Sequence, residues 1–257
     1  NTLITTEVSF FDDVLNSMTL QLQDAKIIAG GTYFDGTNKK LFIARYNTDG
    51  TLDTSFNSTG IQTISADISD DKLNSVTYRA LNGDIIFGGT SFNKVTNRQD
   101  FLIGRLNSNG NVDTSFGSRK TGTTTISFDD GDDIITKIVL QNSTYLGNQT
   151  LAANIYACGY SYNSSTRKFD FAVAAVTNAT TSDGDLLLSF SSDGKKRYQV
   201  GNDDDILTDA LISEVDSLIV CGYSYDTTDN CYKFAIGKIE LVDRDGFDVQ
   251  AGDADTG

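Results

Sequence analysis

The sequence predicts an all-β protein, a β-propeller built from four repeated four-stranded antiparallel blades. Short runs rich in Ile, Val, Thr, Phe and Tyr alternate with clusters of Asp, Asn, Gly and Ser, which is the pattern of strands joined by turns. No apolar stripe with the period of a helix is sustained along the chain. The same order of motifs recurs four times at intervals of about 60 residues, and strands repeated in this way are typical of propeller blades.

Each repeat contains two adjacent acidic residues that lead into an apolar strand. The pairs are Asp12-Asp13, Asp70-Asp71, Asp132-Asp133 and Asp204-Asp205. A second apolar strand then ends in a glycine, at Gly31, Gly89, Gly159 and Gly222. We therefore expect one repeat domain over residues 1–257, with units at approximately 5–60, 61–122, 123–194 and 195–257.

The second repeat contains all four expected strands, in the runs IQTISAD, LNSVTYRA, DIIFGGTS and QDFLIGRLN. Gly88 and Gly89 lie inside the third run, where glycine weakens a strand unless another backbone approaches closely. Crowding near a propeller axis would produce that approach. In the third repeat, the polar stretch 141–154 is expected to be an insertion at a hairpin tip.

The sequence leaves the closure of the propeller open. The four units either close as a four-bladed propeller or form part of a larger one that is completed by further residues or by another copy. A solenoid of stacked coils ranks second, because its period is usually shorter. An open array would expose long strand edges, which proteins normally cover, so we expect closure or partner pairing, including homo-oligomers or filaments.

The strand after each glycine starts with a large apolar residue, and in two repeats it runs into the same tail. These are FIARYNTDGTLDTSF at 42–56, with Arg45, Asn47, Asp49, Gly50 and Asp53, and FLIGRLNSNGNVDTSF at 101–116, with Arg105, Asn107, Gly110 and Asp113. The motif resembles the delta-60 repeat, a propeller-type repeat of bacterial and archaeal surface or secreted proteins. The resemblance implies a scaffold without a defined reaction. Ala175 and Lys238 replace the arginine in the third and fourth repeats, so their tails have drifted.

Composition disfavours several classes of function. With a net charge of -15 and a pI near 4.2, the chain repels phosphate backbones and anionic lipids, so we expect no nucleic-acid partner. No apolar run approaches the roughly 20 residues that span a bilayer, so we expect no membrane insertion. The chain has no His, which rules out Ser-His-Asp, Cys-His and His-metal chemistry.

The acidic residues are the candidates for a ligand site. Because the same pair occurs in every unit, we favour a structural role in which the carboxylates accept backbone N–H bonds at a turn. Calcium is the alternative, since hard cations take closely spaced carboxylate and carbonyl oxygens. The weak calcium candidates are Asp129, Asp130, Asp132, Asp133, Asp203, Asp204, Asp205, Asp243, Asp245 and Asp248. No other cofactor is expected.

Arg45 and Arg105 occupy equivalent strand positions. A ring of such residues could bind an anion, but only two of the four units have Arg there. We therefore favour ion pairs or hydrogen bonds to the tail residues Asp53 and Asp113, which would fix where each blade closes on the next.

The three cysteines are not expected to form a disulfide. Cys158 and Cys221 replace the first glycine of the strand anchor, as small buried thiols. The hairpin after Cys221 would place Cys231 opposite about Tyr225, with Cys221 facing about Ala235, which is out of disulfide reach.

The sequence favours a non-enzymatic extracellular or cell-surface module with a structural or adhesive role, because no unique reactive set of residues stands out from the repeats. The alternative is a lectin-like propeller that binds carbohydrate through polar and aromatic residues in the hairpins 32–40, 91–99, 160–169 and 223–232. A carboxylate-based hydrolase is less favoured, because it needs a non-repeated pair of carboxylates facing one cavity. The expected partner is a protein or a glycan at a surface.

Overall fold

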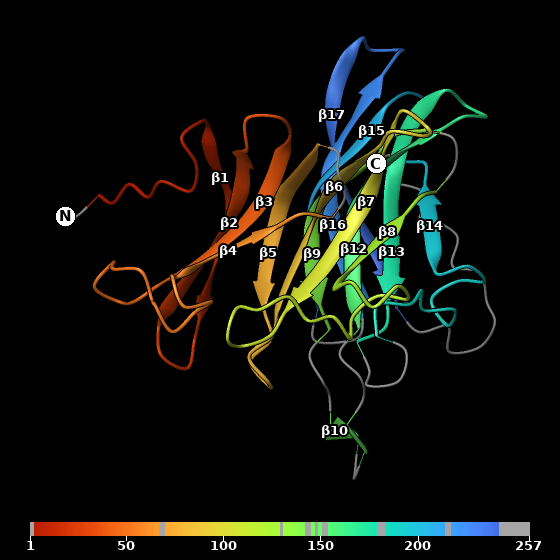
Figure 1. Cartoon of the computed structure of the whole chain (residues 1–257). Coiled ribbons are helices and arrows are strands. Elements are labelled where there is room, and N and C mark those ends of the chain that lie inside the picture. Colours follow the sequence, from red (N-terminus) through yellow and green to blue (C-terminus); the bar gives the residue numbers. More distant parts are fainter. Residues whose placement is uncertain are drawn as a thin grey trace.

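The computed structural model describes residues 3–66, 70–128, 131–141, 145–146, 149–150, 154–178, 183–213 and 217–241. Within these ranges all regular structure is β-strand, without any helix. The strands form antiparallel sheets that stand side by side in a curved row, in the order of the chain (Figure 1). The all-β propeller fold expected from the repeats is therefore confirmed.

Each sheet has the strands expected of a repeat, but one strand was assigned to the wrong blade: the run that starts at Ile61, expected to open the second blade, pairs with the preceding strand of the first blade and closes that sheet. The first sheet contains β1 (Asp13–Gln21), β2 (Lys26–Phe34), β3 (Lys39–Tyr46) and β4 (Ile61–Ile64), and the second contains β5 (Asp71–Tyr78), β6 (Ile85–Asn93), β7 (Arg98–Leu106) and β8 (Thr123–Ile126). The third contains β9 (Asp133–Leu140), β12 (Ile155–Asn163), β13 (Lys168–Val176) and β14 (Lys195–Tyr198). The fourth has three strands in the described part of the chain, β15 (Asp205–Ile212), β16 (Ser217–Asp226) and β17 (Cys231–Glu240).

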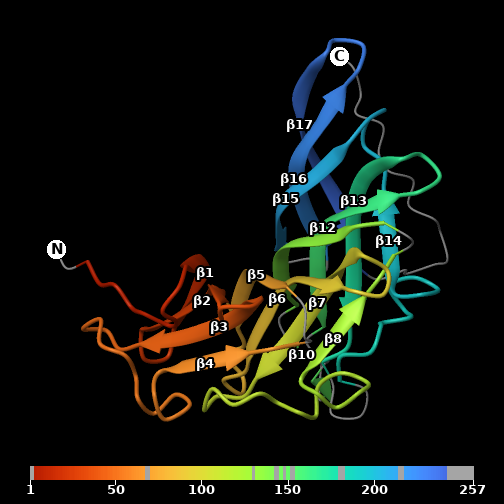
Figure 2. The same cartoon turned by 45° about the horizontal axis from the view of Figure 1, so that its top comes forward.

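The insertion of the third repeat carries a small hairpin of its own, formed by β10 (Tyr145–Leu146) and β11 (Gln149–Thr150). It projects away from the row of blades (Figure 1), and the two ends of that row, the first and the fourth blade, are seen well apart in Figure 2. The extra residues therefore extend one loop and leave the four strands of the third blade in place.

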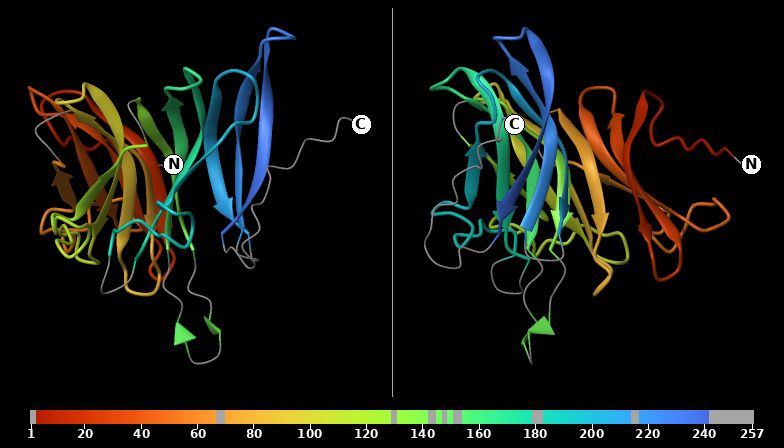
Figure 3. Two further views of the ribbon diagram at one scale, coloured as in Figure 1. Left: turned by 90° about the vertical axis from the view of Figure 1, so that its right-hand side faces the viewer. Right: turned by 180° about the vertical axis from the view of Figure 1, so that it is seen from behind.

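The blades are joined along their first strands. β1 packs against β5, β5 against β9, and β9 against β15. The first and fourth sheets lie at opposite ends of the row (Figure 3, left), and no substantial contact joins them among the described residues. The described chain is thus an open row of four blades with two free end faces.

The core lies between successive blades. Ile28, Leu41 and Ile43 of the first blade pack against Leu73 and Val76 of the second. Two further clusters of the same kind join the second blade to the third and the third to the fourth. Since these apolar faces are covered by the next blade, the stability of one blade depends on its neighbour.

The glycine pairs sit where the backbone is crowded, as expected. A Cβ on Gly89 would collide with the backbone oxygen of Lys72, because β5 has a bulge between Leu73 and Ser75. A Cβ on Gly88 would instead meet the side chain of Ile138 in the next blade. The crowding at the second glycine therefore comes from the first strand of the same blade.

The cysteines are free, and one detail of their predicted geometry is wrong. Cys158 is buried, Cys221 is partly buried and Cys231 is exposed. The register pairs Cys231 with Asp226 and Cys221 with Ile236, one position away from the expectation. The sequence did not set the length of this turn, which ends at Asn230 with a positive φ of 52°.

Candidate functional site

The second aspartate of each pair closes the turn that enters its blade. Its Oδ2 accepts a hydrogen bond from the backbone N–H five residues earlier, at 2.8 Å for Asp13, 3.2 Å for Asp71, 2.8 Å for Asp133 and 2.7 Å for Asp205. This bond recurs in all four blades. The predicted structural role of the acidic pairs is confirmed for these residues.

The first aspartate of the pair links two blades. Asp70 Oδ1 accepts the backbone N–H of Lys39 at 2.7 Å, and Asp132 Oδ1 accepts that of Gln99 at 2.9 Å. Asp204 makes the same bond to Phe169 at 2.8 Å. In each case the donor lies in the β-hairpin of the preceding blade, so these carboxylates hold the outer ends of the blades together.

The calcium candidates are only partly brought together. Asp132 and Asp133 are adjacent and accept the backbone bonds just described, as do Asp204 and Asp205, whereas Asp129, Asp130, Asp243, Asp245 and Asp248 lie outside the described residues. Among the residues that are described, no three Asp, Glu, His or Cys side chains gather as a metal site would require. Calcium binding stays a prediction.

Asp133 is a carboxyl whose pKa is raised by burial. It is fully buried, and burial raises its pKa to about 6, although hydrogen bonds with Ser161 and the backbone of Phe128 act in the opposite direction. The charged form is disfavoured because it loses solvation that those bonds replace only in part.

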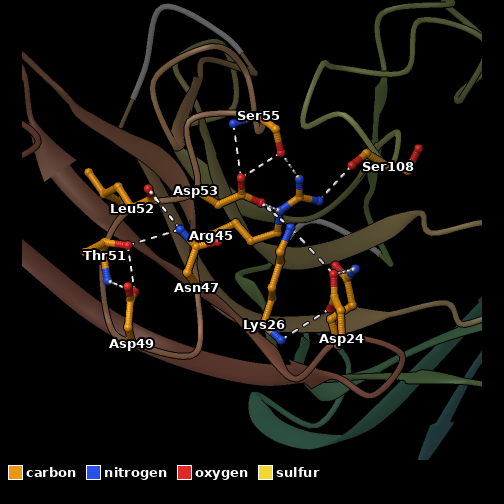
Figure 4. A network of polar contacts seen from close by, with 11 residues as sticks. Asp24, Lys26, Arg45, Asn47, Asp49, Thr51, Leu52, Asp53, Ser55 and Ser108 are labelled. Atoms are coloured by element: carbon orange, nitrogen blue, oxygen red, sulfur yellow. Dashed lines mark hydrogen bonds and ion pairs between the residues drawn. The ribbon is translucent and has the colours of Figure 1, made fainter.

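Arg45 forms a buried ion pair with Asp53 in its own blade and a hydrogen bond with the second blade (Figure 4). Arg45 Nε donates to Asp53 Oδ2 at 2.7 Å, and a second guanidinium nitrogen donates to the backbone oxygen of Ser108 in the second blade at 2.8 Å. Lys26 also donates to Asp53, at 2.9 Å. Burial disfavours the charge on Asp53, but hydrogen bonds from Ser55, Lys26 and Arg45 outweigh burial and hold its pKa well below the usual range.

Arg105 makes the equivalent contact between the second and third blades. It donates to Asp113 at 2.9 Å, to Asn178 at 2.6 Å and to Asp183 at 2.7 Å. Its guanidinium also lies over the ring of Phe116, 5.1 Å from the centroid. The predicted pairing of both arginines with the tail aspartates is confirmed, and each arginine reaches across to the following blade.

An open hollow of about 450 Å³ runs along the first strands of the four blades, β1, β5, β9 and β15. Its walls are crossed by repeated hydrogen bonds: Asn16 Nδ2 donates to the backbone oxygen of Leu73 at 2.6 Å, Asn74 to that of Ile135 at 2.7 Å, and Thr136 to that of Leu207 at 2.9 Å. Most polar groups of the lining therefore hold one blade on the next.

The charged side chains of the hollow are Lys137 and Asp209, which pair at 2.8 Å. The lining contains one carboxylate, and a hydrolase of the kind considered above would need two. The sequence predicted these inner strands, but sequence reasoning missed the polar side chains on them that line the hollow and bond to the next blade. The signal was the triplet Leu-Asn-Ser, which occurs at 15–17 and again at 73–75.

Comparison with known proteins gives a family match that agrees with the fold. A family model described as "Domain of unknown function (DUF5122) beta-propeller" matches residues 22–56 and 82–116, which are corresponding parts of the first two repeats. A solved structure of a BT0996 RGII complex is 11% identical, with a TM-score of 0.39, and the likeness covers 93% of this protein and 74% of the other. No relative was found among curated proteins. The described residues contain no helix that could cross a membrane.

Proposed function

We propose that this chain is a non-enzymatic structural or adhesive module that acts outside the cell or at the cell surface. The observation that supports the proposal is that the same polar contacts are repeated from blade to blade. Carboxylates and guanidiniums in the described blades are held in bonds that recur from one blade to the next. A catalytic centre requires a set of groups that differs from the repeat, and the charged groups lining the hollow are one paired Lys and one paired Asp.

The arrangement suits a stiff display scaffold. Core packing, the Asp-to-hairpin bonds and the buried arginines all join successive blades. The β6–β7, β12–β13 and β16–β17 hairpins project on the same side of the row (Figure 1), so a partner could touch several hairpins at once. Loops that are presented by a rigid framework are the usual place for binding residues.

The extracellular setting comes from the resemblance of the repeats to those of surface and secreted proteins, and the strong negative charge would keep such a chain soluble. If this proposal holds, brief protease treatment of intact source cells releases peptides of this chain, or the medium contains it. Detection of the chain in the cytosol alone would contradict the location.

The role itself is tested with the purified chain coupled to beads. The beads should adhere to surfaces coated with extracellular protein or glycan more strongly than albumin beads do. Asp209→Asn, which removes the carboxylate of the hollow, should adhere as the parent does. Turnover of glycoside or ester substrates that disappears in Asp209→Asn would overturn the non-enzymatic role.

Carbohydrate binding is the second candidate, because aromatic rings gather on the last hairpin. Tyr232 is largely exposed and contacts both Tyr223 and Tyr225 edge to face, with centroids 5.3 and 5.0 Å away. Exposed aromatic rings offer an apolar surface to sugars. A glycan array is the direct measurement: a hit that Tyr232→Ala abolishes supports this candidate, and an array at background contradicts it.

A further inference from the structure

The first blade exposes an apolar face that the other blades bury. On β1, Leu15 and Met18 are 55% and 71% exposed. The equivalent residues of the second blade, Leu73 and Val76, are 0% and 5% exposed. The corresponding residues of the later blades are also buried, at Ile135, Ile138, Leu207 and Ala210. We call the surface formed by Leu15 and Met18 the leading face.

The fourth blade exposes the apolar face that, in each earlier blade, is covered by the blade that follows. On β17, Phe234 and Ile236 are 90% and 71% exposed, whereas the equivalent Phe101 and Ile103 of the second blade are completely buried. The corresponding residues of the other blades, Leu41, Ile43, Phe171 and Val173, are also buried, at 2% exposure or less. We call the surface formed by Phe234 and Ile236 the trailing face.

The two free faces are complementary, because each contact between blades in this chain joins one face of each kind. Leu73 and Val76 share a core with Leu41 and Ile43, and Ile135 and Ile138 share one with Phe101 and Ile103. The leading face of the first blade therefore has the shape and chemistry of a surface that packs on a trailing face.

Polar groups at the two ends match in the same way. Asp12 is exposed and occupies the position of Asp70, which accepts the backbone N–H of Lys39. On the fourth blade the position of Lys39 is held by Tyr232. Asp12 of one molecule is therefore placed to accept the N–H of Tyr232 of another, by the bond that recurs three times within the chain.

A second bond completes the match. The N–H of Val76 donates to Ser17 Oγ, and that of Ile138 donates to Ser75 Oγ. Asp209 holds the corresponding position on the fourth blade, and its carboxylate can accept the N–H of Met18. The first blade thus exposes the apolar and polar groups of one side of the contact between blades, and the fourth blade exposes those of the other side.

We propose that a second copy of this chain docks head to tail, with its leading face on the trailing face of the first copy. The proposal rests on the structural role proposed above and names the partner. The contact is heterologous, since two different surfaces meet, so it continues the row of blades and yields either a closed ring of copies or a filament.

Two variants, each with one blocked face, test this directly. Leu15→Asp/Met18→Asp blocks the leading face, and Phe234→Asp/Ile236→Asp blocks the trailing face. In sedimentation velocity and native mass spectrometry at 1–100 μM, on the order of the concentrations where weak interfaces form, the parent should assemble. Each variant alone should be monomeric, because its remaining face has no complement.

A mixture of the two variants should form a one-to-one dimer and nothing larger, because one intact face of each kind remains. Val95→Asp, at an exposed apolar residue in the β6–β7 hairpin, is the matched control and should assemble as the parent does. Unfolding curves of both blocked variants should match the parent monomer, since the replaced side chains are exposed.

A parent that stays monomeric throughout, or a mixture that stays monomeric, overturns the proposal. A blocked variant that still assembles alone overturns it as well. The bead assay separates the two proposals: adhesion by the monomeric variants preserves the structural or adhesive role even if assembly fails. If the parent assembles but the beads do not adhere and the chain turns over a substrate, the structural or adhesive role is wrong and the head-to-tail contact is still supported.

Discussion

Replacing Arg105 by methionine should destabilise the protein strongly. The guanidinium is 5% exposed and donates to Asp113, Asn178, Ser115 and Asp183 at 2.6 to 3.1 Å. Methionine keeps a long apolar stem against Phe116 but leaves the carboxylate of Asp183 buried without its charge partner. Removing one member of a buried ion pair typically costs about 3–5 kcal/mol. We expect a loss of that size in the free energy of unfolding.

The loss can be measured by urea unfolding, followed through tyrosine fluorescence because the chain has 11 Tyr and no Trp. In a thermal scan the same loss corresponds to a decrease in Tm of roughly 6–20 °C, at about 2–4 °C per kcal/mol for a protein of this size. Arg98→Met, on the same strand β7 but exposed, is the matched control. The reasoning is refuted if Arg105→Met costs less than about 1 kcal/mol, or if Arg98→Met costs as much.

Three further predictions follow from the blade contacts. Arg45→Met should cost less than Arg105→Met in the same urea assay, because Lys26 still pairs with Asp53; an equal or greater loss contradicts this. Gly89→Ala should lower Tm more than Gly88→Ala, because its Cβ meets backbone whereas that of Gly88 meets a side chain; the reverse order would show that the bulge yields. Burial raises the pKa of Asp133 to about 6 in the folded state. Protonated Asp133 therefore stabilises the folded state fully at pH values below the unfolded pKa, and this stabilisation, up to about 3 kcal/mol, is lost as pH rises through about 6. Asp133→Asn should flatten the dependence of unfolding free energy on pH between about 4 and 6, and an unchanged slope argues against a raised pKa.

Much of the fold could be predicted from the sequence because the same strand and turn motifs occur in each of the four repeats. The acidic pairs, the glycine anchors and the Arg-Asp pairing are local in the chain, with Arg45 and Asp53 eight residues apart. Repetition also separated structural residues from candidates for chemistry, since a carboxylate that recurs in every blade has a role in every blade.

The contacts between blades could not be predicted, because they depend on how one sheet is placed on the next. Arg105 finds Asn178 and Asp183 more than 70 residues away, and no spacing in the sequence links them. Lys26, on β2, reaches Asp53 in the tail of the blade, 27 residues further along the chain. The bonds of Asn16, Asn74 and Thr136 were missed for the same reason, since their partners are backbone atoms that carry no sequence signal.

Many side chains that join two blades bond to backbone atoms of the neighbouring blade, and this affects which substitutions the protein tolerates. Asp70, Asn16 and their counterparts bond to an N–H or a carbonyl of the adjoining blade, and every residue type supplies both groups apart from the missing N–H of proline. A substitution on one blade therefore needs no compensating substitution on its neighbour to preserve these bonds. Matched side chains are needed at joints such as that of Arg105 with Asn178 and Asp183, so a change on either side there must be compensated on the other.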